Sequence, residues 1–233
     1  MRVSIIITNY NYDRYLGRAI QSSLAQTVLP KEDWEVIVVD DGSTDNSRKV
    51  IESYLPDIRP LYHEQQRGLP TAVNTGIRGS RSLYILRLDA DDWLDRYTSF
   101  ILAYFLDHNK EIGFVWPDYY VYDEQERVID RISEPQGAGI MFRKQLLVDI
   151  GLYDEEMLIN EDKDILLRCM EKYQGYHLKL PLYRYYRHGN NLTSQKERVE
   201  HYDQQLASKH GKDAWSKGLN IDPGLTPDSG GQR

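Results

Sequence analysis

The feature that most constrains the fold is the alternation of short β-branched runs with longer helical patterns in the first half of the chain. Val3–Thr8 and Trp34–Val39 are almost continuously apolar, which is typical of strands covered on both faces of a sheet. Tyr15–Gln26 carries apolar residues at helical spacing. Leu69–Gly79 has a proline near its start and a glycine at its end, as helices commonly do, and Ser82–Asp89 predicts a further strand. Strands alternating with crossover helices predict an α/β protein with a mostly parallel sheet.

The pattern changes after about residue 112. Ile112–Trp116 and Asp118–Tyr122 are strand-like, and a polar turn joins the second of them to Arg127–Ile132 in a predicted hairpin. Glu161–Tyr173 has the spacing of a helix, and Leu182–Arg187 predicts the last strand. We therefore expect that the second half adds strands and helices to the same domain.

Composition and length bound the classes of function. We expect one domain over residues 1–215, followed by a flexible tail over residues 216–233 that is rich in glycine, proline and polar residues. The formal net charge of −7 disfavours a broad nucleic-acid-binding surface, which needs clustered Lys and Arg. The single cysteine, Cys169, excludes an internal disulfide framework and is expected in the core.

Hydropathy predicts where the chain resides. No run approaches the roughly 20 apolar residues that span a bilayer, and the first apolar run meets Thr8 too early for a signal peptide. We expect a cytoplasmic protein, and peripheral contact with the inner face of the membrane remains open.

Three polar clusters each follow a predicted strand. They are Thr8-Asn9-Tyr10-Asn11, Asp40-Asp41-Gly42-Ser43-Thr44-Asp45 and Asp89-Ala90-Asp91-Asp92. Since the carboxyl ends of parallel strands meet at one edge of a sheet, where ligands of open α/β sheets bind, the clusters are expected to form one site. The alternative is that loops are polar and aspartates cap helices, which accounts for Asp41 and Asp45 better than for Asp89 and Asp91.

Asp89 and Asp91 have the spacing of a metal site. Carboxylates two residues apart at a strand end can face one point while Ala90 turns away. They repel each other unless a cation lies between them, and hard oxygen ligands favour Mg²⁺ or Mn²⁺. Phosphate oxygens of a ligand commonly complete such a site.

Six motifs, in order over about residues 3–193, resemble those of family 2 glycosyltransferases with the GT-A fold. They are Ser4–Asn11, Val38–Asp45, Arg67–Gly76, Leu88–Asp92, Glu161–Asp164 and Arg187–Thr193. The resemblance implies a Rossmann-like three-layer α/β/α domain, with a donor half up to about residue 110 and an acceptor half over about residues 111–215. It also implies hexosyl transfer from a nucleotide diphospho-sugar, UDP-linked, to a hydroxyl of a glycan or glycolipid in polysaccharide biosynthesis.

The resemblance also implies roles for single residues. The residues implied for nucleotide binding are Thr8, Asn9, Tyr10, Asp40, Asp41, Arg67, Asp89 and Ala90. Asp91 would bind Mn²⁺ or Mg²⁺, with His188 at the metal or the diphosphate. Asp162 would be the general base, and Glu161 would orient either this base or the acceptor. The chain departs from the family before Gly68, where Gln65-Gln66-Arg67 replaces a common asparagine, and this departure bears on the role of Arg67.

Such a transfer needs two kinds of help. A cation stabilises the negative charge that grows on the leaving diphosphate, and a base takes the proton from the attacking hydroxyl. One base without a covalent nucleophile implies inversion at the anomeric carbon. Asp162, at a helix start beside Glu161, is the residue we expect to be this base. Spacing alone favours a simpler reading, in which the two acids only stabilise a helix N-terminus.

Other residues also have two readings. Trp93 can stack on an acceptor sugar or simply pack, and His188 can serve the diphosphate or lie solvated at a strand end. Two other functions stay open. A sugar nucleotidyltransferase would release pyrophosphate rather than UDP and carry a basic glycine-rich loop near its start, which Thr8–Asn11 is not. A catalytically silent nucleotide-sugar-binding module would bind the donor without turnover.

Overall fold

The first half of the chain builds a parallel sheet. The computed structural model describes residues 2–26, 30–189 and 196–215. Its first four strands are β1 (Val3–Asn9), β2 (Trp34–Asp40), β3 (Arg59–Tyr62) and β4 (Tyr84–Asp89), all parallel and in the order β3-β2-β1-β4. Because helices cover both faces of this sheet, every residue of β1 is buried, which explains its unbroken apolar sequence.

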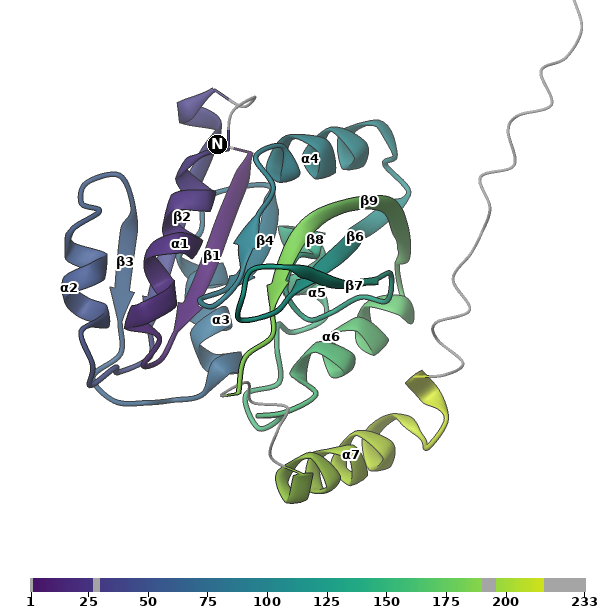
Figure 1. Cartoon of the computed structure of the whole chain (residues 1–233). Helices are drawn as coiled ribbons and strands as arrows, with labels where there is room; N and C mark the ends of the chain where they lie inside the picture. Colours follow the sequence, from purple (N-terminus) through teal and green to yellow (C-terminus); the bar gives the residue numbers. More distant parts are fainter. Residues whose placement is uncertain (1, 27–29, 190–195, 216–233) are drawn as a thin grey trace, which may run out of the picture.

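Helices flank this sheet. They are α1 (Asp13–Leu24), α2 (Ser47–Glu52), α3 (Leu69–Gly79) and α4 (Thr98–His108), with a short 3₁₀ turn η1 (Lys31–Asp33). Figure 1 shows α1 and α2 together on the near side and α3 behind the strands. The α3 helix packs so closely on β1 that a Cβ added at Gly76 would lie 2.4 Å from Cγ2 of Ile6. The glycine is therefore required by the contact.

The second half extends the same sheet with mixed strands. These are β5 (Trp93–Leu94), β6 (Ile112–Tyr122), β7 (Val128–Ile132), β8 (Met141–Arg143) and β9 (Gln174–Tyr186), with α5 (Lys144–Asp149), α6 (Glu161–Met170) and α7 (Lys196–His210). The described sheet runs β3-β2-β1-β4-β8-β6-β9-β5, and β7 pairs with β6. β9 is parallel to β6, whereas β8 is antiparallel to both β4 and β6. The predicted α/β class, with a mostly parallel central sheet, is confirmed.

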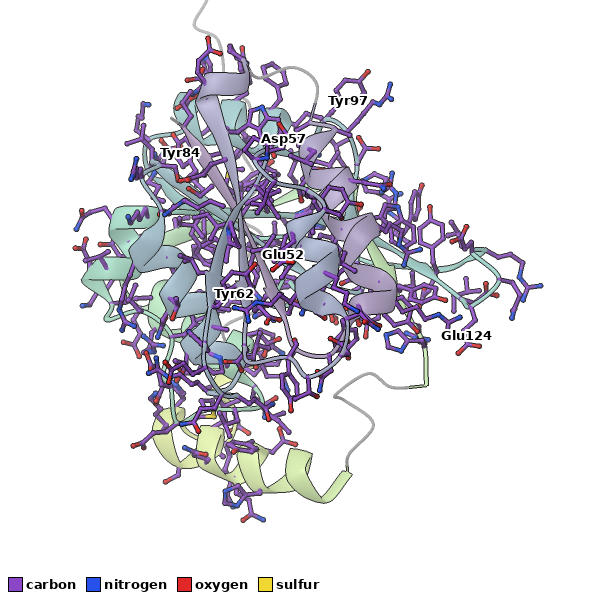
Figure 2. The ribbon with its side chains drawn as sticks, turned by 90° about the vertical axis from the view of Figure 1, so that its left-hand side faces the viewer. Glu52, Asp57, Tyr62, Tyr84, Tyr97 and Glu124 are labelled. Atoms are coloured by element: carbon purple, nitrogen blue, oxygen red, sulfur yellow. The ribbon has the colours of Figure 1, made fainter. Side chains whose placement is uncertain are left out.

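Several predicted elements differ in extent. The two predicted strands before the hairpin are one strand, β6, which passes through Pro117 with a shift of register beside it. β9 begins at Gln174 rather than Leu182, because its first half is held by pairing with β6 and carries little apolar signal. The predicted hairpin forms, and its turn, which carries Glu124, extends outward beyond the sheet (Figure 2). Residues 216–233, predicted as a tail, lie outside the described residues.

Among the described residues, no helix combines the length and the apolar character that crossing a bilayer requires. Cys169 lies on α6 and is fully buried, as predicted.

Candidate functional site

The carboxyl ends of the parallel strands bring the three polar clusters together. In the register of the sheet, Asn9 lies beside Asp40, and Thr8 lies beside Asp89. The Asn9 side-chain amide donates to Asp40 Oδ1 over 2.8 Å and to Ser43 Oγ over 3.1 Å. The predicted convergence of β1, β2 and β4 on one edge is therefore present.

The end of β1 also carries buried polar atoms that need a partner. Within the described part of the chain, Thr8 Oγ1 and Asn9 Oδ1 are buried and have no hydrogen-bond partner. Such an unpaired group costs about 1–3 kcal/mol, so a polar ligand or ordered water at this edge would relieve it. Tyr10, which follows, is half-buried.

Asp41 orders the loop that leads into α3. Its Oδ1 accepts from the backbone N–H of Arg67 over 2.9 Å, and its Oδ2 accepts from that of Gly68 over 2.8 Å. His63 Nδ1 lies 2.6 Å from the same Oδ1. A carboxylate has about four acceptor positions, so Asp41 keeps capacity for a ligand. The Arg67 side chain itself is exposed.

His63 was not singled out from the sequence. It follows β3, the neighbouring parallel strand, so the same rule of strand ends could have found it. Its Nε2 lies 3.0 Å from Thr75 Oγ1 on α3, so the imidazole bridges Asp41 and α3.

The cluster after β4 contains a candidate metal pair. Asp91 Oδ2 lies 3.0 Å from His188 Nε2, and both side chains are largely buried. Burial and the charge of Asp89 raise the pKa of Asp91. His188 is thus a buried partner of the acidic cluster and not a solvated residue at a strand end. Ala90, between the two acids, is buried in the core.

Asp92 holds this cluster against β9. It accepts from the Tyr183 hydroxyl over 2.7 Å and from the Tyr186 backbone N–H over 2.8 Å. Burial, with the charges of Asp91 and Asp89, raises its pKa well above the usual range. Asp92 is therefore a structural tie, although the sequence does not separate it from its neighbours.

Arg87 joins the strand cluster to the start of α6. Its guanidinium donates to Asp89 Oδ1 and to Glu161 Oε1, each over 3.0 Å, and the residue is only 3 % exposed. Burial raises the pKa of Glu161 to about 7, and the charge of Arg87 opposes this rise. Sequence reasoning missed Arg87, yet a charged residue inside the apolar run Leu86-Arg87-Leu88 is a usable signal, because buried charges are paired.

Asp162, at the start of α6, lies close to Arg87. Its Oδ2 accepts from the backbone N–H of Gly137 over 3.3 Å. A Cβ at Gly137 would lie 2.8 Å from Cβ of Asp162 and 3.2 Å from Arg87 Nη1, so these three residues meet at one place. The helix start and the strand cluster are therefore adjacent in space although they lie far apart in the sequence.

Trp93 is partly covered by its neighbours. The Arg18 guanidinium lies 3.7 Å from the centre of the indole, and the Tyr122 ring lies 4.8 Å away. Arg18 also donates to the backbone carbonyl of Asp91 over 3.0 Å. Arg18 and Tyr122 therefore cover part of the Trp93 side chain.

A cleft of about 470 Å³ opens next to Arg18. It lies between α1 and the β6–β7 turn and is lined by Arg14, Tyr15, Arg18, Tyr186 and the turn residues Glu124–Glu126. Tyr15 stacks on His188 with ring centres 4.9 Å apart, so the cleft adjoins the Asp91–His188 pair.

Asp91 and His188 fit a metal ion whose remaining ligands come from a bound phosphate group and water. Among the described residues, no group of three or more His, Cys, Asp and Glu side chains could hold a metal ion alone. Asp91 and His188 supply two converging atoms, and Mg²⁺ or Mn²⁺ sites with few protein ligands take their remaining oxygens from phosphates and water.

Comparison with known proteins places the chain in a family. Residues 4–162 match the sequence profile described as Glycosyl transferase family 2. An uncharacterized glycosyltransferase of Nostoc sp. is 40% identical over 138 residues, which are 57% of this chain and 41% of that protein. The Escherichia coli UDP-Glc:alpha-D-GlcNAc-diphosphoundecaprenol beta-1,3-glucosyltransferase WfgD is 32% identical over 136 residues, 58% of this chain and 51% of that protein. The chain thus matches about half or less of the length of these relatives.

Solved structures show the fold. Residues 1–349 of Staphylococcus aureus TarS, in complex with UDP-GlcNAc, superpose with a TM-score of 0.73 at 20% identity, over 94% of this chain and 72% of that one. The mannosyltransferase PcManGT from Pyrobaculum calidifontis, in complex with GDP-Man and Mn²⁺, gives 0.73 at 18% identity, over 89% and 63%. Together with the sequence profile and the converging strand ends, these likenesses show that the chain belongs to glycosyltransferase family 2 and has the GT-A fold.

Proposed function

We propose that the chain transfers a hexosyl group from a UDP-sugar to a hydroxyl of a glycan or glycolipid acceptor, with inversion at the anomeric carbon. The observation that carries the proposal is the Arg87 bridge, which holds Asp89 and Glu161 at 3.0 Å each. It sets the candidate base at the start of α6 beside the acidic strand end. A diphosphate leaving group and an attacking hydroxyl need these two kinds of group close together.

The edge of the parallel sheet is the donor site in this proposal. Thr8, Asn9, Tyr10, Asp40 and Asp41 line the ends of β1 and β2, where buried polar atoms call for a ligand. Asp89 and Ala90 follow β4, and the exposed Arg67 stands in the loop that Asp41 orders. TarS is described in complex with UDP and with UDP-GlcNAc, which supports a uridine donor.

Asp91 and His188 would hold Mn²⁺ or Mg²⁺ together with the donor diphosphate. When bound, the ion would supply Lewis-acid stabilisation of the charge that develops on the leaving group. Both side chains are buried in an otherwise acidic cluster, so a cation there also relieves the repulsion between Asp89 and Asp91.

Asp162 takes the acceptor proton in this proposal. Its carboxylate accepts from the backbone N–H groups of Gly137 and Lys163, which contributes to its orientation and leaves acceptor positions for a hydroxyl. Glu161 is bound to Arg87 and buried, so its role is to orient the start of α6. Trp93, with Arg18 on its ring, and the adjoining cleft would face the acceptor.

The Asp162→Asn variant tests the base. We expect UDP release from UDP-GlcNAc or UDP-glucose, in the presence of Mn²⁺ and an acceptor panel, to fall by about 10²- to 10⁴-fold. Donor affinity, measured by calorimetry, should stay within a factor of about three, because the amide keeps the shape of the side chain. Asp130→Asn, on the exposed strand β7, is the matched control and should retain full activity.

The same assay separates the other functions. Unchanged turnover in Asp162→Asn would remove this residue from the mechanism. Pyrophosphate instead of UDP as product would favour a nucleotidyltransferase, and tight donor binding without any turnover in the unaltered chain would favour a silent binding module.

A further inference from the structure

Helix α7 lies outside the part of the chain that matches the family profile, which ends at residue 162. It nevertheless packs on the helix that carries the candidate base, as Figure 1 shows. Leu206 of α7 is buried in a small cluster with Met157, before α6, and Leu167, on α6. α7 therefore packs on residues that precede and residues that follow the Glu161–Asp162 pair in the sequence.

Asn160 is the first polar link between the two helices. It precedes α6 in the left-handed conformation, with φ of 64°, and its side chain makes no capping hydrogen bond to the helix. Asparagine at a helix start usually caps with its side-chain oxygen. Here the amide instead donates to Asp203 Oδ1 of α7 over 2.8 Å.

Lys163 provides a second link to the same atom. Its ammonium lies 3.9 Å from Asp203 Oδ1. Asn160 and Lys163 are the residues on either side of Glu161 and Asp162, so one carboxylate of α7 contacts both ends of the pair.

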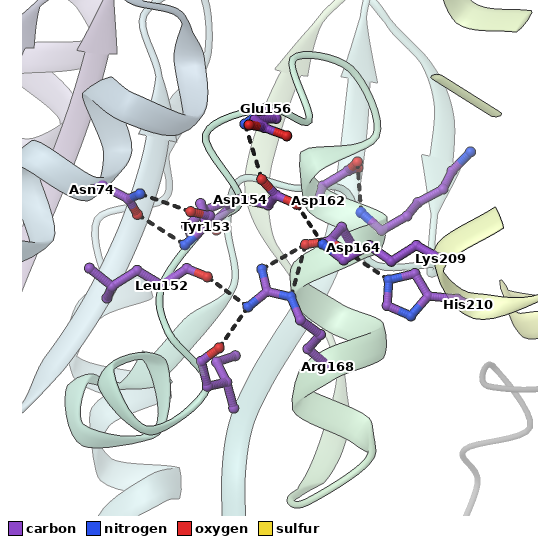
Figure 3. Close-up of polar contacts among 12 residues, drawn as sticks. Asn74, Leu152, Tyr153, Asp154, Glu156, Asp162, Asp164, Arg168, Lys209 and His210 are labelled. Atoms are coloured by element: carbon purple, nitrogen blue, oxygen red, sulfur yellow. Dashed lines mark hydrogen bonds and ion pairs between the residues drawn. The ribbon is translucent and has the colours of Figure 1, made fainter. Parts of the chain in front are cut away.

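Asp164 anchors the first turn of α6 at a second point. Its carboxylate is fully buried and lies 2.7 Å from Lys209 Nζ and 2.8 Å from His210 Nε2, both on α7 (Figure 3). Arg168 donates to the same carboxylate from within α6. Although burial opposes the charge of Asp164, these contacts with Lys209, His210 and Arg168 hold its pKa below the usual range. The first turn of α6 is thus fixed to α7 at two successive levels.

We propose that α7 is a positioning element for the transfer reaction and that Asp203 is a positioning residue, which acts through Asn160 to fix the Glu161–Asp162 pair. The inference rests on the proposed function, because it takes Asp162 as the base. Its physical reason is that the Asn160 side chain does not cap α6 locally, so the hydrogen bond that Asn160 donates to Asp203 restrains the helix start and with it the direction of the Asp162 carboxylate. Small displacements of a catalytic group are costly in rate.

A double-mutant cycle tests the route through Asn160. The variants are Asp203→Ala, Asn160→Gly and their combination; glycine keeps the left-handed backbone and removes only the amide. We expect each single variant to lower the kcat of UDP release from UDP-GlcNAc by roughly ten-fold with donor KM within two-fold. The combination should be no slower than either single variant.

Two further variants separate positioning from general stability. Asp203→Asn keeps an acceptor oxygen for Asn160 and should recover kcat to within about three-fold of the unaltered chain. Gln204→Ala changes the next, exposed residue of α7 and should behave like the unaltered chain. Equal kcat in Asp203→Ala and Gln204→Ala, or effects of Asp203→Ala and Asn160→Gly that multiply in the combination, would overturn the inference.

Amide hydrogen exchange measures the stability of the start of α6 independently of catalytic turnover. Asp203→Ala should speed exchange of the amides of residues 160–166, including the Asp164 N–H that bonds to Asn160 O, while β1 amides are unchanged. Unchanged exchange at these amides would refute the restraint. If exchange responds but the unaltered chain releases no UDP, the proposed function fails and the restraint by α7 stands.

Discussion

At the scale of single residues, the site depends on charges that the fold has removed from water. Glu161 and Arg87 are both buried, and Arg87 forms ion pairs with both Asp89 and Glu161. Breaking a buried pair of this kind leaves an uncompensated charge, which is far more costly than losing an exposed pair. Burial also disfavours the charged form of Glu161, so the stability of the fold is expected to depend on the ionisation of this carboxyl group.

Glu161→Gln tests this dependence. Burial raises the folded-state pKa of Glu161 from 4.5 to about 7, so the protonated form is favoured by folding. Its stabilising contribution is complete below pH 4.5 and is lost as the pH rises to about 7. In urea unfolding between pH 4.5 and 8, we expect the unaltered chain to lose stability relative to Glu161→Gln. Parallel pH curves for the two proteins would contradict the raised pKa.

At the scale of elements, close packing between a helix and a strand can require a residue that helix propensity disfavours, as it does at Gly76. Gly76→Ala should stabilise α3 by about 1 kcal/mol on helix propensity. The Cβ would, however, lie 2.4 Å from Ile6, and we expect a net loss of about 1–3 kcal/mol in unfolding experiments. Gly17→Ala on α1 is the matched control, because its Cβ would meet only the Tyr54 hydroxyl at 3.3 Å. Similar unfolding midpoints for both variants would show that α3 can shift away from β1.

The elements also show how far the sequence can predict the structure. β1, β2 and α3 were predicted to within a residue, because unbroken apolar runs and helix-end signals are local. The convergence of their strand ends followed from the parallel topology. The two-residue β5 and the early part of β9 were missed, since both depend on pairing with distant strands.

The candidate site divides in the same way. Acidic residues such as Asp91 could be selected from their place after a strand. The tie from Asp41 to His63 and the bridge from Arg87 to Glu161 needed the three-dimensional arrangement. No pattern in the sequence pairs Asn160 with Asp203, because such a contact depends on how two helices dock.

At the scale of the whole molecule, ligand binding should stabilise the fold only when donor and metal act together. With UDP and Mn²⁺ at about 100 times their Kd, linkage predicts roughly 2.7 kcal/mol of added stability, or several degrees in Tm for a chain of this size. EDTA should remove most of the shift. Asp91→Ala should show little of it, because this variant loses one of the two protein ligands that we propose for the ion. A full shift by UDP in EDTA would exclude a role for the cation in nucleotide binding.

The single cysteine can serve as a probe of local opening around α6. Cys169 lies on α6, the helix that begins with the proposed base Asp162, and its side chain is buried. Burial raises the pKa of its thiol to about 12. A sulfhydryl that is both enclosed and protonated is inert towards alkylating reagents until its surroundings separate. The rate at which Cys169 is alkylated therefore measures how often the packing around α6 opens.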